Sequence, residues 1–283
     1  MQAGFLGIAR LLVERGVIRS GTFGATVPAA FVLGLAALLG LAAGPVAGSA
    51  AAGQPPGIIG GDNRVVIEAD DRRWHAVGRL NRETGGFCTA VLIGPKEALT
   101  AAHCLWDQLR RRWVDPQSLH FVPGYRRGTY LGHARVARYR LAEGIAIDEQ
   151  GHPESLLDDW AVLELTLDLE AGAGIEPMAL AERTERPSLA GRAIASGGYS
   201  RDRPHLPVKV QPCRALGVIE SGRLLLHDCD SSAGSSGSPI VVEEGGRFVV
   251  VGIQSAVVSA GGETLALAVL MQRAMPATVL LSQ

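Results

Sequence analysis

The sequence predicts an all-β fold, a barrel or a sandwich, for most of this 283-residue chain. From Ile58 onward, apolar runs of four to eight residues alternate with Gly, Pro, Asn and Asp. The runs are rich in β-branched residues, as in "RVVIEA" and "RFVVVGIQSAVV". Short runs between turn residues are typical of antiparallel strands. The length, and a formal charge of -1, suit one large globular domain or two small ones.

The first 57 residues have a different character. Arg10, Arg15 and Arg19 precede an uncharged apolar stretch at 25–47, which small residues follow. A basic head, an apolar run and a small-residue tail are typical of an export signal, so a periplasmic or secreted protein is expected. The apolar stretch is also long enough to span a bilayer, which makes a retained membrane anchor the alternative. A membrane partner is expected only in that case.

The charge balance excludes a nucleic-acid partner. Beyond residue 57, 24 basic side chains stand against 27 acidic ones, so no basic surface is expected. The run Arg110, Arg111 and Arg112 is short and lies between Asp107 and Asp115, as is typical of a solvated face.

The cysteines predict two disulfides. All four lie beyond the leader, and an even number in an exported chain is typical of disulfide pairs. They are Cys88, Cys104, Cys213 and Cys229, so each sequential pair is separated by 16 residues. Closing such a loop contributes roughly 3 kcal/mol. Zinc is the competing use, but no Cys-x-x-Cys or His-x-x-x-His spacing occurs, so neither a metal nor another cofactor is expected.

Two segments within the β pattern favour helix instead. They are "AAHCLWDQLRRR", after residue 100, and the C-terminal "MPATVLLSQ". The stretch at 168–182 is the one plausible seam between two halves. The predicted division is therefore a leader at 1–57, a first half at 58–170 and a second half at 171–283.

Three motifs carry the residue types of nucleophilic catalysis. "LTAAHC" places His103 at the end of an apolar strand, and "DDWAVLEL" places Asp159 at the entrance to another. "GSSGSP" places Ser236 between Gly234 and Gly237, which permit a tight turn that aims two backbone N–H groups at one point. A serine hydroxyl is inert at neutral pH, so it needs a base and an acid that orients that base. The three motifs supply both.

These motifs resemble the three signature blocks of the chymotrypsin-like serine proteases. "IIGGDNR", "WHAVGRL" and "HDCDSSAGSSGSP" are closer to the bacterial branch of that family, which includes the glutamyl endopeptidases. The resemblance covers about residues 58–283. It implies two antiparallel six-stranded β-barrels with the active site between them. It also implies a serine endopeptidase acting on proteins or peptides without a cofactor, and we expect a monomer.

The resemblance implies a role for each motif residue. His103 would be the general base, Asp159 would orient it and stabilise its charge, and Ser236 would be the nucleophile. The N–H groups of Gly234 and Ser236 would form the oxyanion hole. Asp158 is the immediate alternative to Asp159, but the strand register after it favours Asp159. The other serines of the turn and the other histidines are expected to be structural or exposed.

The resemblance also implies the disulfide pairing. In that family the cysteine beside the histidine pairs with one about sixteen residues earlier. This matches Cys88 with Cys104 and leaves Cys213 to pair with Cys229.

Three residues are expected to bind substrate. Asp230 lies six residues before Ser236, where trypsin-like members keep the acid that binds Lys or Arg, so a slight preference for basic residues is expected. Gln254 stands where glutamyl endopeptidases have a histidine that binds the substrate carboxylate, and a Gln supplies no positive charge there. Ser255 and its neighbours are expected to pair with the substrate backbone as an added strand.

The animal digestive members carry an aspartate at the position of Ser235, where it pairs with a freshly cut N-terminus. The sequence "IIGG", beginning at Ile58, resembles such a terminus. Without the aspartate that ion pair cannot form, so removal of the leader would suffice for activity.

Two rival functions would also use a serine in such a motif. An α/β-hydrolase needs Gly-x-Ser-x-Gly and a histidine after the serine, but Ser238 takes the place of the last glycine and no histidine follows Ser236. A non-catalytic binding protein on a protease fold would be expected to have lost a triad residue, and none is lost. It remains the alternative function.

Overall fold

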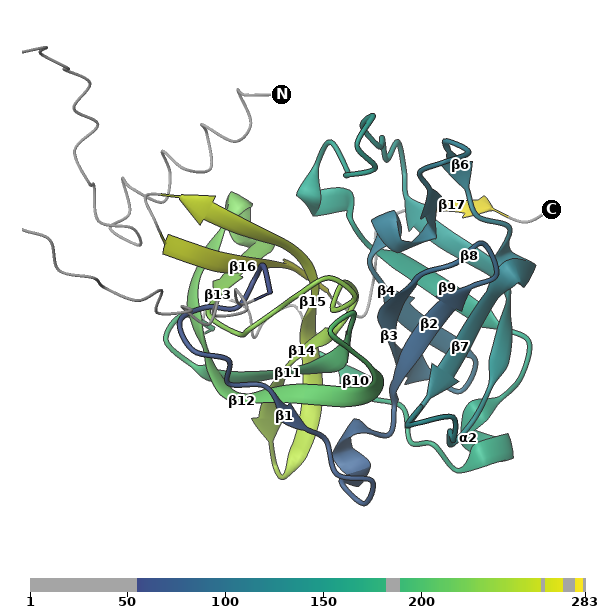
Figure 1. Cartoon of the computed structure of the whole chain (residues 1–283), viewed down its shortest axis with the longest axis horizontal. Helices are drawn as coiled ribbons and strands as arrows, with labels where there is room; N and C mark the ends of the chain where they lie inside the picture. Colours follow the sequence, from purple (N-terminus) through teal and green to yellow (C-terminus); the bar gives the residue numbers. More distant parts are fainter. Residues whose placement is uncertain (1–54, 182–188, 261–262, 272–277, 282–283) are drawn as a thin grey trace, which may run out of the picture. The chain divides into compact units, whose positions relative to one another are not determined.

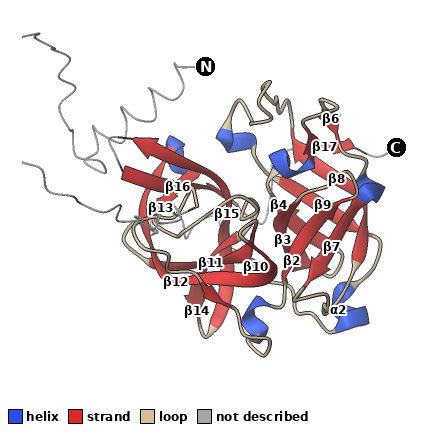
Figure 2. Ribbon diagram, in the orientation of Figure 1, coloured by secondary structure: helices blue, strands red, loops and turns tan. Residues whose placement is uncertain are grey.

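The computed structural model describes residues 55–181, 189–260, 263–271 and 278–281. The predicted leader therefore lies almost wholly outside the described residues. The described chain consists mostly of strands, with short helices between them (Figures 1 and 2). Two sheets close into six-stranded antiparallel barrels, which confirms the predicted fold class. No helix among the described residues is long and apolar enough to cross a bilayer.

The first barrel combines strands that are buried over most of their length, such as β3, β4 and β9, with the more exposed β8. Its order is β8-β7-β2-β3-β4-β9, and pairing of β8 with β9 closes it. Its largest fully buried side chains are Trp160, Tyr139 and Phe121, and the Tyr139 hydroxyl donates to the Val114 carbonyl at 2.7 Å. The strands are β2 (Val77–Arg82), β3 (Phe87–Gly94), β4 (Glu97–Thr100), β7 (Leu119–Pro123), β8 (Ala134–Ala142) and β9 (Ala161–Leu165).

The second barrel follows the same plan in the order β12-β11-β14-β15-β16-β13, closed by pairing of β12 with β13. Ile194, Leu225 and Ile240 lie in its buried core. Burying one such side chain stabilises the fold by about 1.5–3 kcal/mol. The strands are β11 (Ala193–Ser200), β12 (Arg203–Ile219), β13 (Leu224–His227), β14 (Pro239–Glu244), β15 (Arg247–Ala260) and β16 (Glu263–Leu270).

Three short strands lie outside the two closed rings. β1 (Val65–Val66) pairs with β12 of the second barrel, whereas β17 (Thr278–Leu281) pairs with β8 of the first. β10 (Ala179–Leu180) pairs with β15 in parallel. The predicted seam contains α2 (Leu169–Ala173), whose first turn is capped by the Asp168 carboxylate. The remaining short helices are η1 (Arg72–Trp74), η2 (Ala102–Leu105), η3 (Pro116–Ser118), η4 (Leu156–Asp158) and η6 (Glu220–Gly222).

The helix expected after residue 100 is wrong. Only the single turn η2 forms there, and a hairpin of β5 (Trp106–Asp107) and β6 (Arg112–Trp113) follows. The rings of Trp106 and Trp113 meet edge to face at 5.1 Å, and the Asp107 carboxylate accepts the N–H of Arg110 across the turn. Leu109 is 93% exposed, so a helix would have had no apolar face to bury here.

The helix expected at the C-terminus is also wrong where the chain is described. Residues 278–281 form β17, antiparallel to β8, with Thr278 opposite Ala142. Its β-branched residues favour strand, and pairing with β8 satisfies backbone groups that an isolated short helix would leave open.

Both predicted disulfides are present. Cys88 of β3 is bonded to Cys104 of η2, and Cys213 of β12 is bonded to Cys229, just after β13. The first fastens the helical turn that carries His103 to a barrel strand.

Candidate active site

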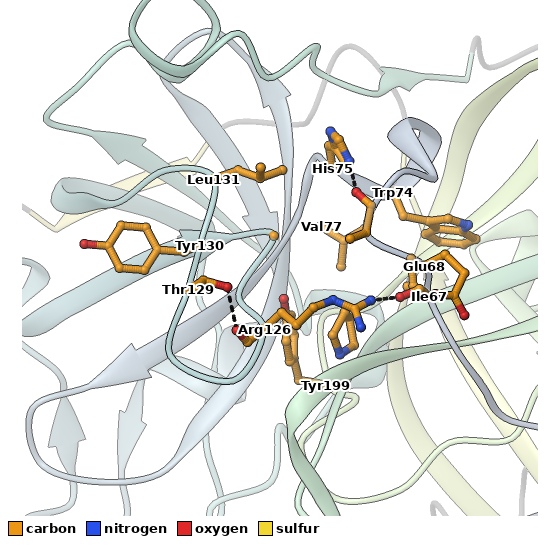
Figure 3. A pocket seen from close by; sticks show the side chains of 13 residues that line it. Ile67, Glu68, Trp74, His75, Val77, Arg126, Thr129, Tyr130, Leu131 and Tyr199 are labelled. Atoms are coloured by element: carbon orange, nitrogen blue, oxygen red, sulfur yellow. Dashed lines mark hydrogen bonds between the residues drawn. The ribbon is translucent and has the colours of Figure 1, made fainter.

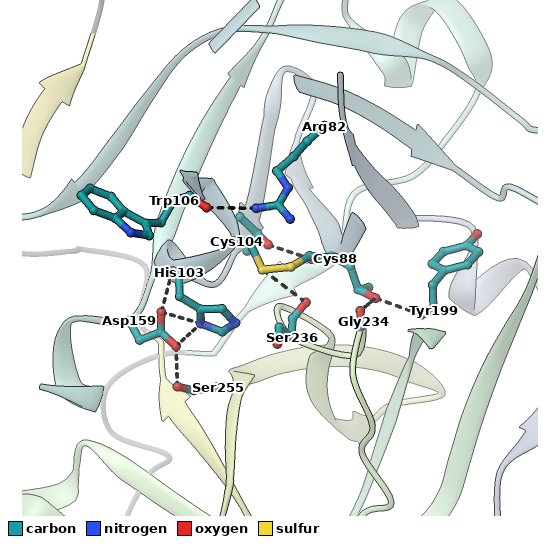
Figure 4. Close-up of a disulfide and its surroundings, with 12 residues drawn as sticks. Arg82, Cys88, His103, Cys104, Trp106, Asp159, Tyr199, Gly234, Ser236 and Ser255 are labelled. Atoms are coloured by element: carbon teal, nitrogen blue, oxygen red, sulfur yellow. Dashed lines mark hydrogen bonds and ion pairs between the residues drawn. A yellow bond between two sulfur atoms is a disulfide. The ribbon is translucent and has the colours of Figure 1, made fainter. Parts of the chain in front are cut away.

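His103 and Asp159 are brought together by two paired strands. His103 follows β4 and Asp159 precedes β9, and these strands pair with Thr100 opposite Ala161. The Asp159 carboxylate is fully buried and accepts from the His103 backbone N–H at 3.0 Å. Its other oxygen lies 2.8 Å from the imidazole Nδ1 (Figure 4). Because Nδ1 faces an acceptor, the neutral ring keeps its lone pair on Nε2.

The electrostatics keep Asp159 ionised. Burial raises the pKa of this carboxyl group, but the charge and hydrogen bonds of His103 and a hydrogen bond from the Ser255 hydroxyl lower it by more. For His103, burial lowers the pKa, whereas the Asp159 charge and hydrogen bond raise it above the ordinary value of 6.5. An imidazolium at this position is therefore stabilised by a fixed carboxylate.

Ser236 reaches the same place from the second barrel. Its carbonyl accepts from the Thr89 N–H of β3 at 2.9 Å and lies 3.9 Å from the Cys104 sulfur. Since Cys104 is the neighbour of His103 in the chain, these contacts hold the Ser236 backbone against the segment that carries the imidazole. In Figure 4 the ring edge opposite Asp159 is turned toward Ser236.

The turn around Ser236 leaves two N–H groups open. Those of Ser235, Gly237 and Ser238 donate to backbone carbonyls at 2.8–2.9 Å. Within the described residues, the N–H groups of Gly234 and Ser236 donate to no protein acceptor. Gly237 has a φ of +81° and a Cβ there would lie 2.2 Å from the Thr89 carbonyl oxygen, so only glycine fits.

The structure corrects the expectation for Asp230. One carboxylate oxygen accepts from the Ile59 N–H and the other from the Asn63 N–H, both at 2.7 Å. Asp230 is only 6% exposed. Because a buried carboxylate is stabilised by such N–H donors, it holds the segment before β1 and is not free for a substrate cation. The expected preference for basic residues therefore loses its basis.

The other two residues expected to bind substrate lie on β15. The Gln254 side chain is buried and donates to the Ala256 carbonyl at 2.8 Å, and its backbone bonds to Gly237 and Ser238 of the turn. Ser255 lies where the pairing of β15 with β16 shifts register, so its backbone is outside the regular ladder. Its hydroxyl donates to Asp159, a role that the sequence did not suggest.

A buried arginine links the N-terminal segment to the nucleophile turn. The Arg64 guanidinium donates to Ser200 Oγ at 3.3 Å, to Ser232 Oγ at 3.0 Å and to Asp202 at 2.7 Å. Arg64 is 5% exposed and its other carboxylate partner is Asp62. This network places the buried cation of Arg64 against Ser232, three residues before Ser235. Ser235 stands where the animal digestive members of the family carry an aspartate. Sequence motifs gave no signal for this network.

His227 is a second buried group that the motifs did not single out. It is fully buried on β13, and its Nδ1 accepts from the Cys229 N–H at 3.3 Å. Its Nε2 and the Gln254 Oε1 have no hydrogen-bond partner among the described residues. Burial lowers the pKa of His227 to about 3, with a small opposing contribution from Gln254. The ring is therefore neutral in the folded protein across the physiological range.

This burial predicts a loss of stability in acid. The unfolded chain protonates His227 below about pH 6.5, whereas the folded chain does so only near pH 3. The free energy of unfolding should thus fall by roughly 1.4 kcal/mol per pH unit within that window on account of this residue. In urea titrations from pH 7 to pH 4, His227→Gln should show a shallower decline than the wild type, and exposed His152→Gln should not. Equal slopes for all three proteins would contradict the assignment.

A possible metal-ligand cluster lies at the site, and a separate pocket lies elsewhere on the described chain. The ligand atoms of Cys88, His103 and Cys104 lie within 4.8 Å of one another, but both sulfurs are held in the disulfide and cannot bind a metal as thiolates. A pocket of about 260 Å³ is lined by Trp74, Arg126 and Tyr130 among others (Figure 3). It contains none of the predicted site residues.

The fold defines a double β-barrel protein in which Asp159 holds the ring of His103 and the Ser236 backbone contacts Thr89 and Cys104. A family model described as Trypsin matches residues 58–277, and the chain belongs to that family. The predicted resemblance is thereby confirmed.

Individual relatives are distant. The chain is 29% identical over 152 residues to Kallikrein 1-related peptidase b21 of Mus musculus, and this alignment covers 50% of the chain and 51% of that protein. It is 24% identical over 192 residues to a glutamyl endopeptidase of Bacillus licheniformis, and this alignment covers 67% of the chain and 56% of that protein. The chain thus spans about half the length of the curated relatives it matches.

A solved Glu endopeptidase in complex with MPD superposes with a TM-score of 0.59 at 20% identity. The match covers 76% of this chain and 94% of that chain, and it supports the fold.

Proposed function

We propose that this protein is a serine endopeptidase that hydrolyses peptide bonds through an acyl-enzyme on Ser236. The observation that carries the proposal is the fixed imidazole of His103. Its Nδ1 is held by the fully buried Asp159, and its free edge is turned toward Ser236 (Figure 4). This is the arrangement that activates a serine hydroxyl.

The chemistry follows from these positions. His103 Nε2 takes the proton of Ser236 Oγ while that oxygen attacks the substrate carbonyl carbon. The resulting oxyanion is stabilised by the open N–H groups of Gly234 and Ser236. His103 then gives the proton to the leaving amine, which breaks the peptide bond and leaves an ester on Ser236. A water molecule, deprotonated by the same imidazole, hydrolyses the ester. Asp159 keeps the required tautomer and stabilises the imidazolium.

Export is part of the same proposal. Two disulfides suit an oxidising compartment, and the leader at 1–57 has the composition of an export signal, with a membrane anchor as the alternative. Protein or peptide substrates would then be met outside the cytoplasm.

A non-catalytic binding protein is the second candidate. It has no use for two open N–H groups beside a serine, nor for a carboxylate buried against a histidine. Unpaired polar groups of this kind are costly unless they serve a function.

Labelling with a fluorophosphonate separates the two candidates. The wild type should form a covalent adduct that peptide mapping locates on Ser236, because only an activated serine attacks this reagent. Ser236→Ala and His103→Ala should not be labelled, whereas Ser235→Ala should be. A folded wild type that resists labelling would favour the binding protein.

A further inference from the structure

Two arginine side chains without a carboxylate partner lie beside the site. Arg82, at the end of β2, donates to the Gly85 carbonyl at 3.1 Å and to the Trp106 carbonyl at 3.0 Å (Figure 4). Arg201 follows β11, and its backbone N–H donates to Ala233 of the nucleophile turn at 2.7 Å. Within the described chain neither guanidinium forms an ion pair. Arg82 is half-buried and Arg201 is exposed.

The positive charge of this region is incompletely balanced. Burial lowers the pKa of Arg82, Asp107 opposes that effect, and the charge of Arg201 lowers the pKa further. Asp107 is itself bonded to Arg110 at 2.7 Å. The charge of Arg82 also acts on His103, whose pKa it lowers. The bond from Arg82 to Trp106 and the bond from the Arg201 N–H to Ala233 place both residues close to the site. A half-buried cation is stabilised when an anion joins it.

A third cation reinforces the patch. The Arg79 guanidinium stacks on the Phe87 ring at 3.9 Å, and Phe87 lies against the nucleophile turn, since a Cβ on Gly234 would be 2.9 Å from that ring. The Nε of Arg79 is buried and has no hydrogen-bond partner among the described residues.

The position of the patch relative to the scissile bond follows from the strands. Among the described strands, β14 pairs with β15 only as far as Ile253, whereas β16 pairs with β15 from Gly252 to Ala260. Beyond Gln254, β15 therefore has one open edge, and the acyl half of a substrate is expected to add there as a strand. The Ser236 carbonyl contacts Thr89 of β3 and the Cys104 sulfur of the Cys88–Cys104 disulfide. If the acyl half follows β15, we expect the leaving half to extend over this disulfide, toward Arg82 and Arg201.

Building on the proposed peptidase activity, we propose that Arg82 and Arg201 form a cationic subsite for the leaving half of the substrate. It binds a carboxylate side chain of the first or second residue after the scissile bond. Aspartate or glutamate at one of these positions supplies an ion-pair partner, which Arg82 lacks among the described residues. A guanidinium and a carboxylate also match each other in hydrogen-bonding geometry.

Matched quenched-fluorescent peptides test the subsite. All share one acyl half and differ only in carrying Glu, Gln or Lys at the first or second position after the scissile bond. The wild type should cleave the better Glu peptide with a kcat/KM about tenfold above its Gln counterpart, and the Lys peptide should be slower still. The advantage should shrink between 20 mM and 500 mM salt, because exposed charges are screened.

The variants identify the residues. Arg82→Gln and Arg201→Gln should each reduce the Glu-to-Gln ratio of kcat/KM, and Arg201→Glu should invert the preference in favour of Lys. The ratio is the readout because loss of the Arg82 charge also alters His103, and that change affects both peptides equally. Arg201 is exposed, so its variants keep the test valid if Arg82→Gln fails to fold. Arg247→Gln, on the distant β14–β15 turn, is the control and should leave the ratio unchanged.

The outcomes separate this subsite from the proposed function. If the wild type cleaves the Gln peptide well and shows no advantage for Glu, the subsite is wrong while the peptidase stands. If the Arg201 variants keep the full advantage, Arg201 is not part of it. If no peptide is cleaved and fluorophosphonate does not label Ser236, the peptidase proposal fails and the subsite fails with it.

Discussion

Replacing Ser236 with alanine is expected to lower kcat for peptide hydrolysis by about 10⁶-fold. The reason is that alanine removes the hydroxyl that would attack the substrate carbonyl, while the Asp159-held ring of His103 and the open N–H groups of the turn stay in place. His103→Ala should cost a similar factor. The double variant should be little worse than either single one, because base and nucleophile act as a unit. Turnover of a quenched peptide, measured after active-site titration of the wild type, provides the comparison.

The neighbouring serine is the matched control. Ser235 differs from Ser236 by one position, and its Oγ accepts from the Ser232 N–H at 3.4 Å. Ser235→Ala should therefore retain activity within about tenfold, a loss that reflects only the turn geometry. Near-normal casein hydrolysis by Ser236→Ala would show that the nucleophile lies elsewhere.

Asp159→Asn should reduce kcat by about 10⁴-fold while leaving the fold nearly intact. The amide removes the charge that stabilises the imidazolium and can donate to Nδ1, which favours the wrong tautomer of His103. Asp158→Asn is the control, because the Asp158 carboxylate is half-exposed and its ion-pair partner is Arg223, at 3.7 Å. It should change kcat less than a few-fold. A larger loss in Asp158→Asn than in Asp159→Asn would reverse the assignment.

The same variant should change the pH profile in a defined direction. His103 acts as a base only when neutral, and Asp159 raises its pKa above 6.5. Wild-type kcat/KM is thus expected to fall as the pH drops through a value above 6.5. In Asp159→Asn the raising effect is lost, so the residual activity should persist to lower pH. A pH series of kcat/KM for the two proteins tests this shift.

Much of the fold could be predicted from local pattern. Short apolar runs between turn residues predicted strands because barrel strands bury most of their side chains, as β3, β13 and β14 do. The six strands of each barrel form where those runs occur. The helix predictions failed for "AAHCLWDQLRRR" and for the C-terminus. In the first segment, the packing of the Trp106 and Trp113 rings in a hairpin outweighed weak local helix propensity. At the C-terminus, pairing of β17 with the distant strand β8 did the same.

The sequence by itself determined the three motif residues that are proposed to act at the candidate site. His103, Asp159 and Ser236 are recognised from short motifs because a tight turn and a strand end demand particular neighbours. The disulfide pairs also followed from the spacing and the resemblance, and both are present.

The tertiary structure alone decided which polar groups are already in use. Asp230 has the position of a specificity residue in sequence, yet its oxygens are taken by Ile59 and Asn63, which lie more than 160 positions away. Other contacts also join segments that are distant in the chain. They link the Ser255 hydroxyl to Asp159, the Arg64 guanidinium to Ser232 and the Arg82 guanidinium to the Trp106 carbonyl. The physical reason is that the energy of a charged or polar side chain depends on burial and on its hydrogen-bond partners, and neither is encoded within a few residues of it.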